Sequence, residues 1–129
     1  MSQGAVLDAS AVLALLQDEP GAAVVEDVLG DAAMSSVNWA EVAGSLAARG
    51  LPATELRESV EALGISVLAF DVLDADATGE LLPSTRDAGL SLADRACLAL
   101  ASRLDAPALT ADRAWLDLEL GVDVHCIRA

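Results

Sequence analysis

GAVLDASAVLALL, residues 4 to 16, is the stretch that decides the fold, because a single aspartate, Asp8, interrupts an otherwise apolar run. The AVL before Asp8 is typical of a short buried strand, and ASAVLALLQ after it is typical of a helix that begins around Asp8 and Ser10. A carboxylate in apolar surroundings is costly unless it is paired, hydrogen-bonded or bound to a metal. Asp8 therefore marks a strand-to-helix junction at which something must stabilise a charge.

Short apolar strands alternate with helices along the rest of the chain. Apolar runs predict further strands at residues 32–37, 65–70, 107–110 and 122–127. Helical spacing and end signals predict helices at 20–30, 38–50, 52–64, 72–86, 90–104 and 111–120, with Asn38 and Ser91 as N-caps. This alternation favours one α/β domain over residues 1–129, a central parallel β-sheet flanked by helices on both faces. Ligands of such folds bind at the carboxyl ends of the strands.

The composition narrows the class of protein. One Phe, two Trp and no Tyr in 129 residues exclude a module that binds nucleic acids by aromatic stacking. The longest apolar run is far shorter than the roughly 20 residues of a membrane span, and the first residues lack the features of a signal peptide. We therefore expect a soluble, cytoplasmic protein. Cys97 and Cys126 are too few for a disulfide framework or a zinc site and are expected to be reduced thiols that help fill the core.

The chain is strongly acidic, with a formal net charge of −14 and seven basic residues, all of them arginine. A protein with this charge does not coat a nucleic acid by releasing counterions. Attraction to a polyanion would have to come from local arginines and bound cations, and the acidic surface suits a basic protein partner.

Four acids, Asp8, Glu41, Asp94 and Asp112, lie at the expected starts of helices. Each alone has an ordinary explanation, because an acid there meets unpaired backbone N–H groups and the positive end of the helix dipole, which is worth about 0.3 to 1 kcal/mol. NWAE and SLAD also match the spacing of a capping box. Together, however, the four are expected to meet at one edge of a parallel sheet. Carboxylates so close repel one another unless a hard cation such as Mg²⁺ or Mn²⁺ neutralises them.

Four segments resemble, in order, the successive motifs of PIN-domain ribonucleases, in particular the VapC-type toxins of bacterial type II toxin–antitoxin systems: VLDASAVLALL, NWAEV, LSLADRACLALA and LTADRAW. The resemblance covers nearly the whole chain. It implies that Asp8, Glu41, Asp94 and Asp112 are the catalytic residues, which bind one or two Mg²⁺ or Mn²⁺ ions and hydrolyse RNA phosphodiester bonds. It also implies a homodimer and a cognate VapB-like antitoxin that restrains the enzyme.

Further positions take meaning from the same resemblance. Ser10 and Thr110 match hydroxyl positions near the acidic quartet. Many members of the family carry another acid two residues after the last aspartate, where this chain has Ala114, and Asp117 in the next turn is a candidate substitute. Arg95 and Arg113 each follow a matched acid, so they are candidates for contacts with phosphate, with a solvated surface position as the alternative.

Two other classes of protein remain as alternatives. A haloacid-dehalogenase-like phosphatase would use Asp8 as a nucleophile, but Ser10 stands where it needs a second aspartate, and the chain has no lysine. A non-enzymatic binding or assembly domain would use the four acids only as helix caps. His125 is expected to be structural or exposed. The apolar faces of residues 38–50 and 52–64 are expected to lie in the core, with a dimer surface or an antitoxin groove as the alternative.

Overall fold

Five parallel strands form one sheet in the order β3-β2-β1-β4-β5. The computed structural model describes residues 4–128, so the expected domain ends at residues 1 and 129 lie outside the described residues. Each expected strand is present, the first with its predicted bounds and the other four shorter than the sequence predicts: β1 Ala5–Leu7, β2 Ala32–Ser35, β3 Ile65–Leu68, β4 Ala108–Thr110 and β5 Val124–Cys126. The predicted parallel sheet is confirmed.

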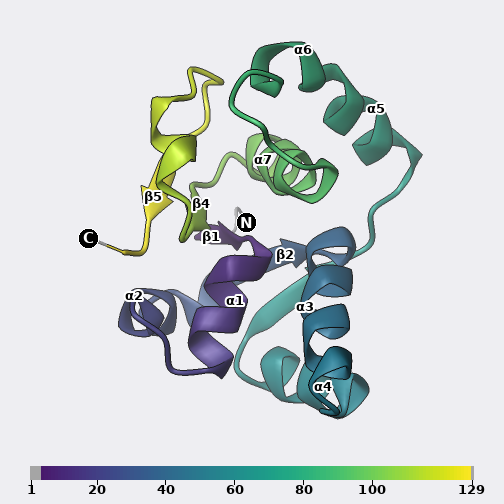
Figure 1. Ribbon diagram of the computed structural model, residues 1–129, viewed down its shortest axis with the longest axis vertical. Coiled ribbons are helices and arrows are strands. Elements are labelled where there is room, and N and C mark those ends of the chain that lie inside the picture. Colours follow the sequence, from purple (N-terminus) through teal and green to yellow (C-terminus); the bar gives the residue numbers. More distant parts are fainter. Residues whose placement is uncertain (1–3, 129) are drawn as a thin grey trace.

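Helices cover both faces of the sheet, as Figure 1 shows. In that view α1 to α4 lie below the strands and α5 to α7 lie above them. Their bounds are α1 Ala9–Leu16, α2 Ala22–Glu26, α3 Ser36–Ala48, α4 Ala53–Ala62, α5 Val72–Glu80, α6 Leu82–Thr85 and α7 Leu92–Leu104, with 3-10 helices η1 Leu29–Asp31 and η2 Arg113–Asp117. No helix in residues 4–128 is both long and apolar enough to cross a membrane.

Alternating side chains of the central strand separate two apolar clusters. Ala5 and Leu7 belong to a cluster with residues of α1 to α4, whereas Val6 belongs to a second cluster with residues of α7. All three side chains are fully buried because β1 lies in the middle of the sheet with both faces covered. Cys97 is buried and Cys126 is half-buried, and both are free thiols, as expected.

Three predicted helices form as shorter, divided or 3-10 helices. The segment 20–30 forms only the short α2 and then η1, and α2 begins after Gly21 because that residue adopts a left-handed backbone conformation (φ 99°). The segment 72–86 is two helices, α5 and α6, which meet at Leu81, and Pro83 lies in the first turn of the second, where a missing N–H costs no helical hydrogen bond. The segment 111–120 contains a 3-10 helix rather than an α-helix.

The start of α3 is the correction that matters most for the site. The predicted N-cap at Asn38 is wrong, because α3 begins at Ser36 and the Ser35 hydroxyl accepts the hydrogen bond from the Val37 N–H at 3.1 Å. Glu41 therefore lies in the second turn of α3, outside the first turn, and NWAE is not a capping box. Asn38 is left inside the helix with its amide available for another contact.

Gly64 and Gly50 follow α4 and α3 in left-handed conformations, with φ of 107° and 73°, and they make a matched pair for testing the packing. A Cβ at position 64 would lie 2.7 Å from the Leu29 carbonyl oxygen, whereas one at position 50 would meet nothing within 4 Å among residues 4–128. Both substitutions to alanine carry a left-handed penalty of about 1 to 2 kcal/mol. We expect Gly64→Ala to lose about 1 to 3 kcal/mol more than Gly50→Ala in urea unfolding, because of the added clash. Equal losses would contradict this packing.

Candidate active site

The strand order places a topological switch point between β1 and β4. The chain runs from β1 outward to β2 and β3 on one side and then crosses to β4 and β5 on the other. Crevices at the carboxyl ends of the strands flanking such a point are where α/β sheets bind ligands. Asp8 directly follows β1, and Asp112 lies two residues beyond Thr110, the last residue of β4.

The Asp8 carboxylate is buried, with 4% of the residue exposed, and it accepts three hydrogen bonds. Its Oδ1 accepts from the Ser10 hydroxyl at 2.7 Å and from the Ala11 N–H at 2.8 Å, which makes Asp8 the N-cap of α1. Its Oδ2 accepts from the Thr110 hydroxyl at 2.6 Å. Burial raises the pKa of Asp8 and the nearby Asp94 charge raises it further, while the three hydrogen bonds oppose the rise.

Ser10 and Thr110 join the ends of the two strands through Asp8. The Ser10 hydroxyl donates to Asp8 and accepts from the Ala111 N–H at 2.9 Å, and the Thr110 hydroxyl donates to Asp8 and accepts from the Asp112 N–H at 3.0 Å. Each hydroxyl therefore has its proton directed at the carboxylate. The structure places both hydroxyls where the sequence motifs suggested, next to the first acid.

Asp94 lies in the first turn of α7, where it forms a capping box with Ser91. The Ser91 hydroxyl accepts from the Asp94 N–H at 3.1 Å, and Asp94 Oδ2 accepts from the Ser91 N–H at 2.9 Å. This arrangement fixes the carboxylate at the helix start while leaving the residue half-buried. The predicted cap of α7 is confirmed.

Glu41 approaches from α3 and completes a group of three interacting acids. Glu41 is exposed as a whole residue, but its carboxyl is partly buried. This partial burial raises the pKa of the carboxyl, and the charges of Asp94 and Asp8 raise it further. Because Asp94 also raises the pKa of Asp8, the three carboxylates lie close enough to repel one another. The structure thus brings together Asp8 at the N-cap of α1, Asp94 in the first turn of α7 and Glu41 in the second turn of α3.

The Asp112 carboxylate makes its hydrogen bond outside this group of three acids. The carboxylate is exposed and accepts from the Ala114 N–H at 2.9 Å, so it caps η2. It is not among the charges that raise the pKa of Asp8 or Glu41. Within residues 4–128, no three His, Cys, Asp or Glu side chains converge closely enough to hold a metal ion as they stand. An ion shared by these carboxylates would require rotation of their side chains.

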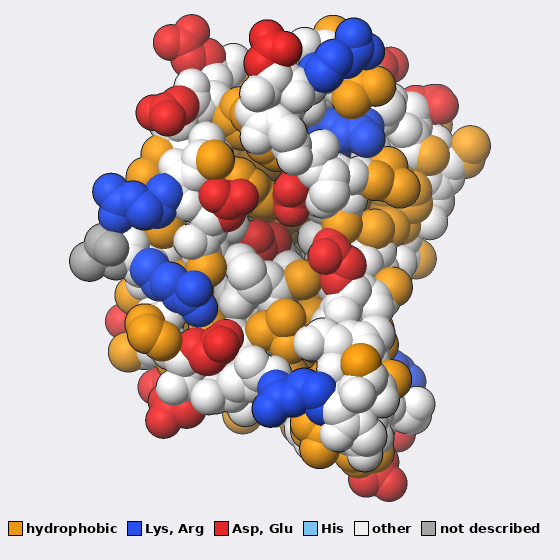
Figure 2. All heavy atoms as spheres, in the orientation of Figure 1, with side chains coloured by type: hydrophobic (Ala, Val, Ile, Leu, Met, Phe, Trp, Pro, Cys, Tyr) orange, Lys and Arg blue, Asp and Glu red, His pale blue; other side chains and the backbone are white. Residues whose placement is uncertain are grey.

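The donor set nevertheless fits a hard divalent cation. Figure 2 shows acidic side chains gathered around a hollow in the middle of the face that it presents. Carboxylate oxygens are the ligands that Mg²⁺, Mn²⁺ and Ca²⁺ prefer, whereas the one thiol close to the group, Cys97, is fully buried. Asp8 uses three of the roughly four acceptor positions of a carboxylate, so one remains.

A family model of the PIN domain matches residues 5–119. The chain belongs to the PIN domain family. No curated protein sequence matches this PIN domain significantly. Its fold is similar to that of three solved structures: a toxin–antitoxin complex from Klebsiella pneumoniae (18% identity, 92% of this chain and 95% of that chain covered, TM-score 0.73), DNA-bound VapBC from Salmonella typhimurium (16%, 95% and 97%, 0.70) and FitAcB from Neisseria gonorrhoeae (21%, 95% and 97%, 0.70).

Arg95 and Cys97 follow Asp94 on α7 of the PIN domain, and both side chains are held by the fold. Arg95 donates from Nη1 to the Thr78 carbonyl at 3.1 Å, so its guanidinium packs between α7 and α5. Cys97 lies three residues after Asp94 on the same helix face, and burial, then the charges of Asp8 and Asp94, raise the pKa of its thiol well above the ordinary value. The three-residue spacing between Asp94 and Cys97 is a sequence signal from which the position of Cys97 near the acids could have been predicted.

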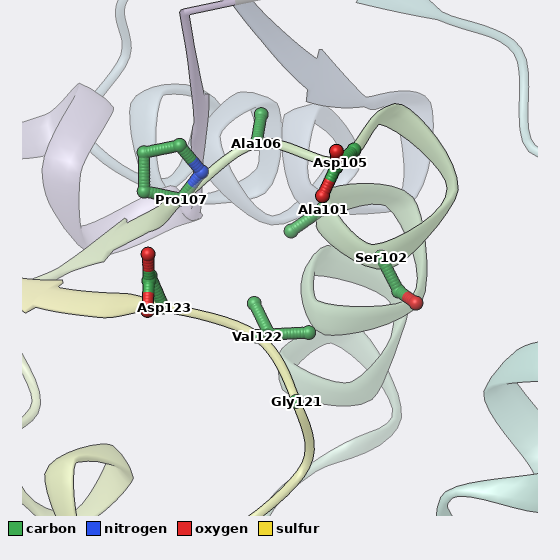
Figure 3. A pocket seen from close by; sticks show the side chains of 8 residues that line it. All are labelled: Ala101, Ser102, Asp105, Ala106, Pro107, Gly121, Val122 and Asp123. Carbon is green, nitrogen blue, oxygen red and sulfur yellow. The ribbon is translucent and has the colours of Figure 1, made fainter.

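Other polar groups of the PIN domain lie away from this site. Asp71 and Asp74 form the capping box of α5, and Asp74 also pairs with Arg103 at 3.1 Å. His125 is exposed on β5. A separate pocket of about 250 Å³ lies at the opposite end of the sheet, before β4 and β5 and beside the end of α7 (Figure 3), lined by Ala101, Ser102, Asp105, Ala106, Pro107, Gly121, Val122 and Asp123.

The burial of Asp8, together with the nearby Asp94 charge, predicts a pH-dependent cost to stability. A carboxyl whose pKa is higher in the folded protein than in the unfolded chain loses stability as pH rises from the unfolded to the folded pKa. Asn at position 8 keeps an oxygen for Ser10 and Ala11 and removes the charge, but its Nδ2 cannot accept from the Thr110 hydroxyl, a loss that does not depend on pH. We therefore expect the free energy of unfolding of Asp8→Asn, taken relative to the wild type, to be higher at about pH 7 than near pH 3, where Asp8 is protonated in both states.

The measurement is urea unfolding over this pH range, with the exposed Asp76→Asn on α5 as the charge-matched control. If Asp8→Asn and Asp76→Asn show the same pH dependence, the pKa of Asp8 is not raised by folding.

Proposed function

We propose that this PIN domain is a metal-dependent endoribonuclease that hydrolyses RNA phosphodiester bonds, and that it is the VapC-type toxin of a toxin–antitoxin pair. The observation that carries the proposal is the group of three mutually repelling carboxylates, Asp8, Glu41 and Asp94, at the carboxyl ends of β1 and its neighbours. Repelling acids lower stability, so their assembly is best explained by a cationic ligand.

The proposed catalytic residues and metal ligands are Asp8, Glu41, Asp94 and Asp112, and the proposed ions are Mg²⁺ or Mn²⁺. Such an ion, when bound, polarises a phosphate oxygen and lowers the pKa of water, so no histidine is needed. Asp8 contributes a carboxylate whose orientation is fixed by three hydrogen bonds. Asp94 contributes one fixed by its capping box, whereas Glu41 and Asp112 are exposed and more easily reoriented.

Positive charges near the acids are needed to bind the phosphates of RNA. The acidic group itself repels a phosphate, so the attraction must come from the cation and from neighbouring arginines. Arg113 directly follows Asp112, is exposed and makes no ion pair within residues 4–128. Arg95 already donates to a helix carbonyl. Arg113 is therefore the better candidate for a phosphate contact.

A protein partner follows from the relatives and from the charge. The structures that this fold resembles include toxin–antitoxin complexes and VapBC bound to DNA. We propose a VapB-like antitoxin as the cognate partner, with a basic segment that complements a chain of net charge −14. We further propose that the protein forms a homodimer and acts in the cytoplasm.

Cleavage of total cellular RNA by the purified protein tests the proposed activity. We expect discrete cleavage with Mg²⁺ or Mn²⁺ and none with a chelator. Asp94→Asn should reduce the rate about 100-fold or more, because even the outer partners of metal ligands are typically worth 10- to 100-fold. Asp105→Asn, at the other end of the same helix, is the matched control and should retain activity.

No cleavage by folded protein with any divalent ion would favour a non-enzymatic binding domain. Cleavage that persists in chelator would contradict metal dependence.

The role of Arg113 has its own test. Removing one charge-assisted hydrogen bond to phosphate costs enough to weaken RNA binding about 10-fold. We expect Arg113→Gln to raise KM for RNA by that factor with little change in kcat. Arg49→Gln, at the far end of α3, is the control and should leave KM unchanged. An equal effect of both substitutions would show that only the net charge matters.

A further inference from the structure

Asn38 occupies an unusual place between two of the acid-bearing helices. It lies in the first turn of α3, 1% exposed, and its Nδ2 donates to the Ala93 carbonyl of α7 at 3.0 Å. Ala93 directly precedes Asp94. Glu41 lies three residues after Asn38 on the same face of α3, because residues three apart in a helix are neighbours on its surface. Asn38 therefore lies one helical turn from Glu41, and its hydrogen-bond partner, Ala93, is the residue next to Asp94.

The orientation of the Asn38 amide is fixed by its partner. A carbonyl oxygen only accepts hydrogen bonds, so the nitrogen of the amide must face Ala93, and Oδ1 must point elsewhere. That oxygen is buried and has no hydrogen-bond partner among residues 4–128. A buried acceptor without a partner costs at least as much stability as one neutral hydrogen bond contributes. Folding stability alone therefore does not explain an asparagine at this position.

We propose that Asn38 is a positioning residue, which sets the distance between the Glu41 and Asp94 carboxylates by fixing α3 against the first turn of α7. The connection from one acid to the other is short: one turn of α3, a single hydrogen bond, and the peptide between Ala93 and Asp94. The Ser91 capping box already fixes Asp94 relative to its own helix. The Asn38 bond supplies the remaining constraint, between the two helices.

This inference rests on the proposed metal-dependent function, and it deepens the description of the same site. A cation shared by Glu41 and Asp94 needs their carboxylates within a narrow range of separations, and those carboxylates repel each other. Outer partners that orient metal ligands are typically worth 10- to 100-fold in metal affinity. Asn38 acts as such an outer partner, because it bonds the backbone carbonyl of Ala93, the residue before Asp94.

Mn²⁺ titration calorimetry on the purified, folded protein tests the proposal without using activity. We expect Asn38→Leu to raise the Kd for Mn²⁺ about 10-fold while the free energy of unfolding stays at or above the wild-type value. Thr85→Val is the matched control: it also removes a hydrogen bond from a buried side chain to a backbone carbonyl, here that of Leu81 at 2.7 Å, but on α6. It should leave the Mn²⁺ Kd unchanged. Asn38→Ala serves if Asn38→Leu does not fold.

A double-mutant cycle with Glu41→Gln separates positioning from general damage. If Asn38 acts by placing Glu41, Asn38→Leu has no further effect on the Mn²⁺ Kd in the Glu41→Gln background. An unchanged Kd in Asn38→Leu, or a full additive loss in the double variant, overturns the proposal.

A crystal structure of Asn38→Leu distinguishes failure of this proposal from failure of the proposed function. If the wild type binds no Mn²⁺, the proposed metal site fails, and the crystal structure alone decides the role of Asn38. A shift of α3 relative to α7 that separates Glu41 from Asp94 supports positioning. Unchanged packing of the two helices overturns it.

Discussion

The hydrogen bonds that hold the buried Asp8 carboxylate join β1 to β4 across the switch point of the sheet. Ser10 and Thr110 each direct a hydroxyl proton at Asp8 and accept a backbone N–H from the segment after β4. The same carboxylate caps α1 through the Ala11 N–H. One charged group thus fixes the start of a helix and the relative position of two strand ends, so the geometry of the whole acidic edge depends on it.

The assembly of acids around Asp8 reduces stability in a chain that is already strongly acidic. Burial and mutual repulsion raise the pKa values of Asp8 and Glu41. Ionising either carboxyl therefore costs more free energy in the folded protein than in the unfolded chain, which lowers the free energy of unfolding. Functional sites commonly violate the rules that stabilise a fold, with the cost offset elsewhere. Here the two apolar clusters on either side of β1 supply that stability.

Much of this fold follows from local patterns in the sequence. The five strands, the N-cap at Ser91 and the strand-to-helix junction at Asp8 were all predictable, because apolar runs and capping residues act over a few positions. The start of α3 was not. Ser35 and Asn38 are both good caps three residues apart, and only the pairing of β2 with β3 as far as Ser35 selects the first.

The sequence named four candidate acids and did not predict how their side chains are arranged. Asp112 caps η2 through its bond to the Ala114 N–H, and the sequence predicted an α-helix where this 3-10 helix forms. The contact between Asn38 and Ala93 joins positions 55 residues apart and has no local signal. Contacts of this kind arise only when the helices pack.

Anomalous diffraction from a crystal of the wild-type protein soaked in Mn²⁺ shows whether a cation binds among these acids. We expect a single strong peak, or a close pair, within ligand distance of Asp8, Glu41 and Asp94, with Asp112 rotated toward it from its position before η2. The absence of a peak at these acids in crystals that contain Mn²⁺ elsewhere, or a peak held by a different set of residues, would contradict the proposed metal site.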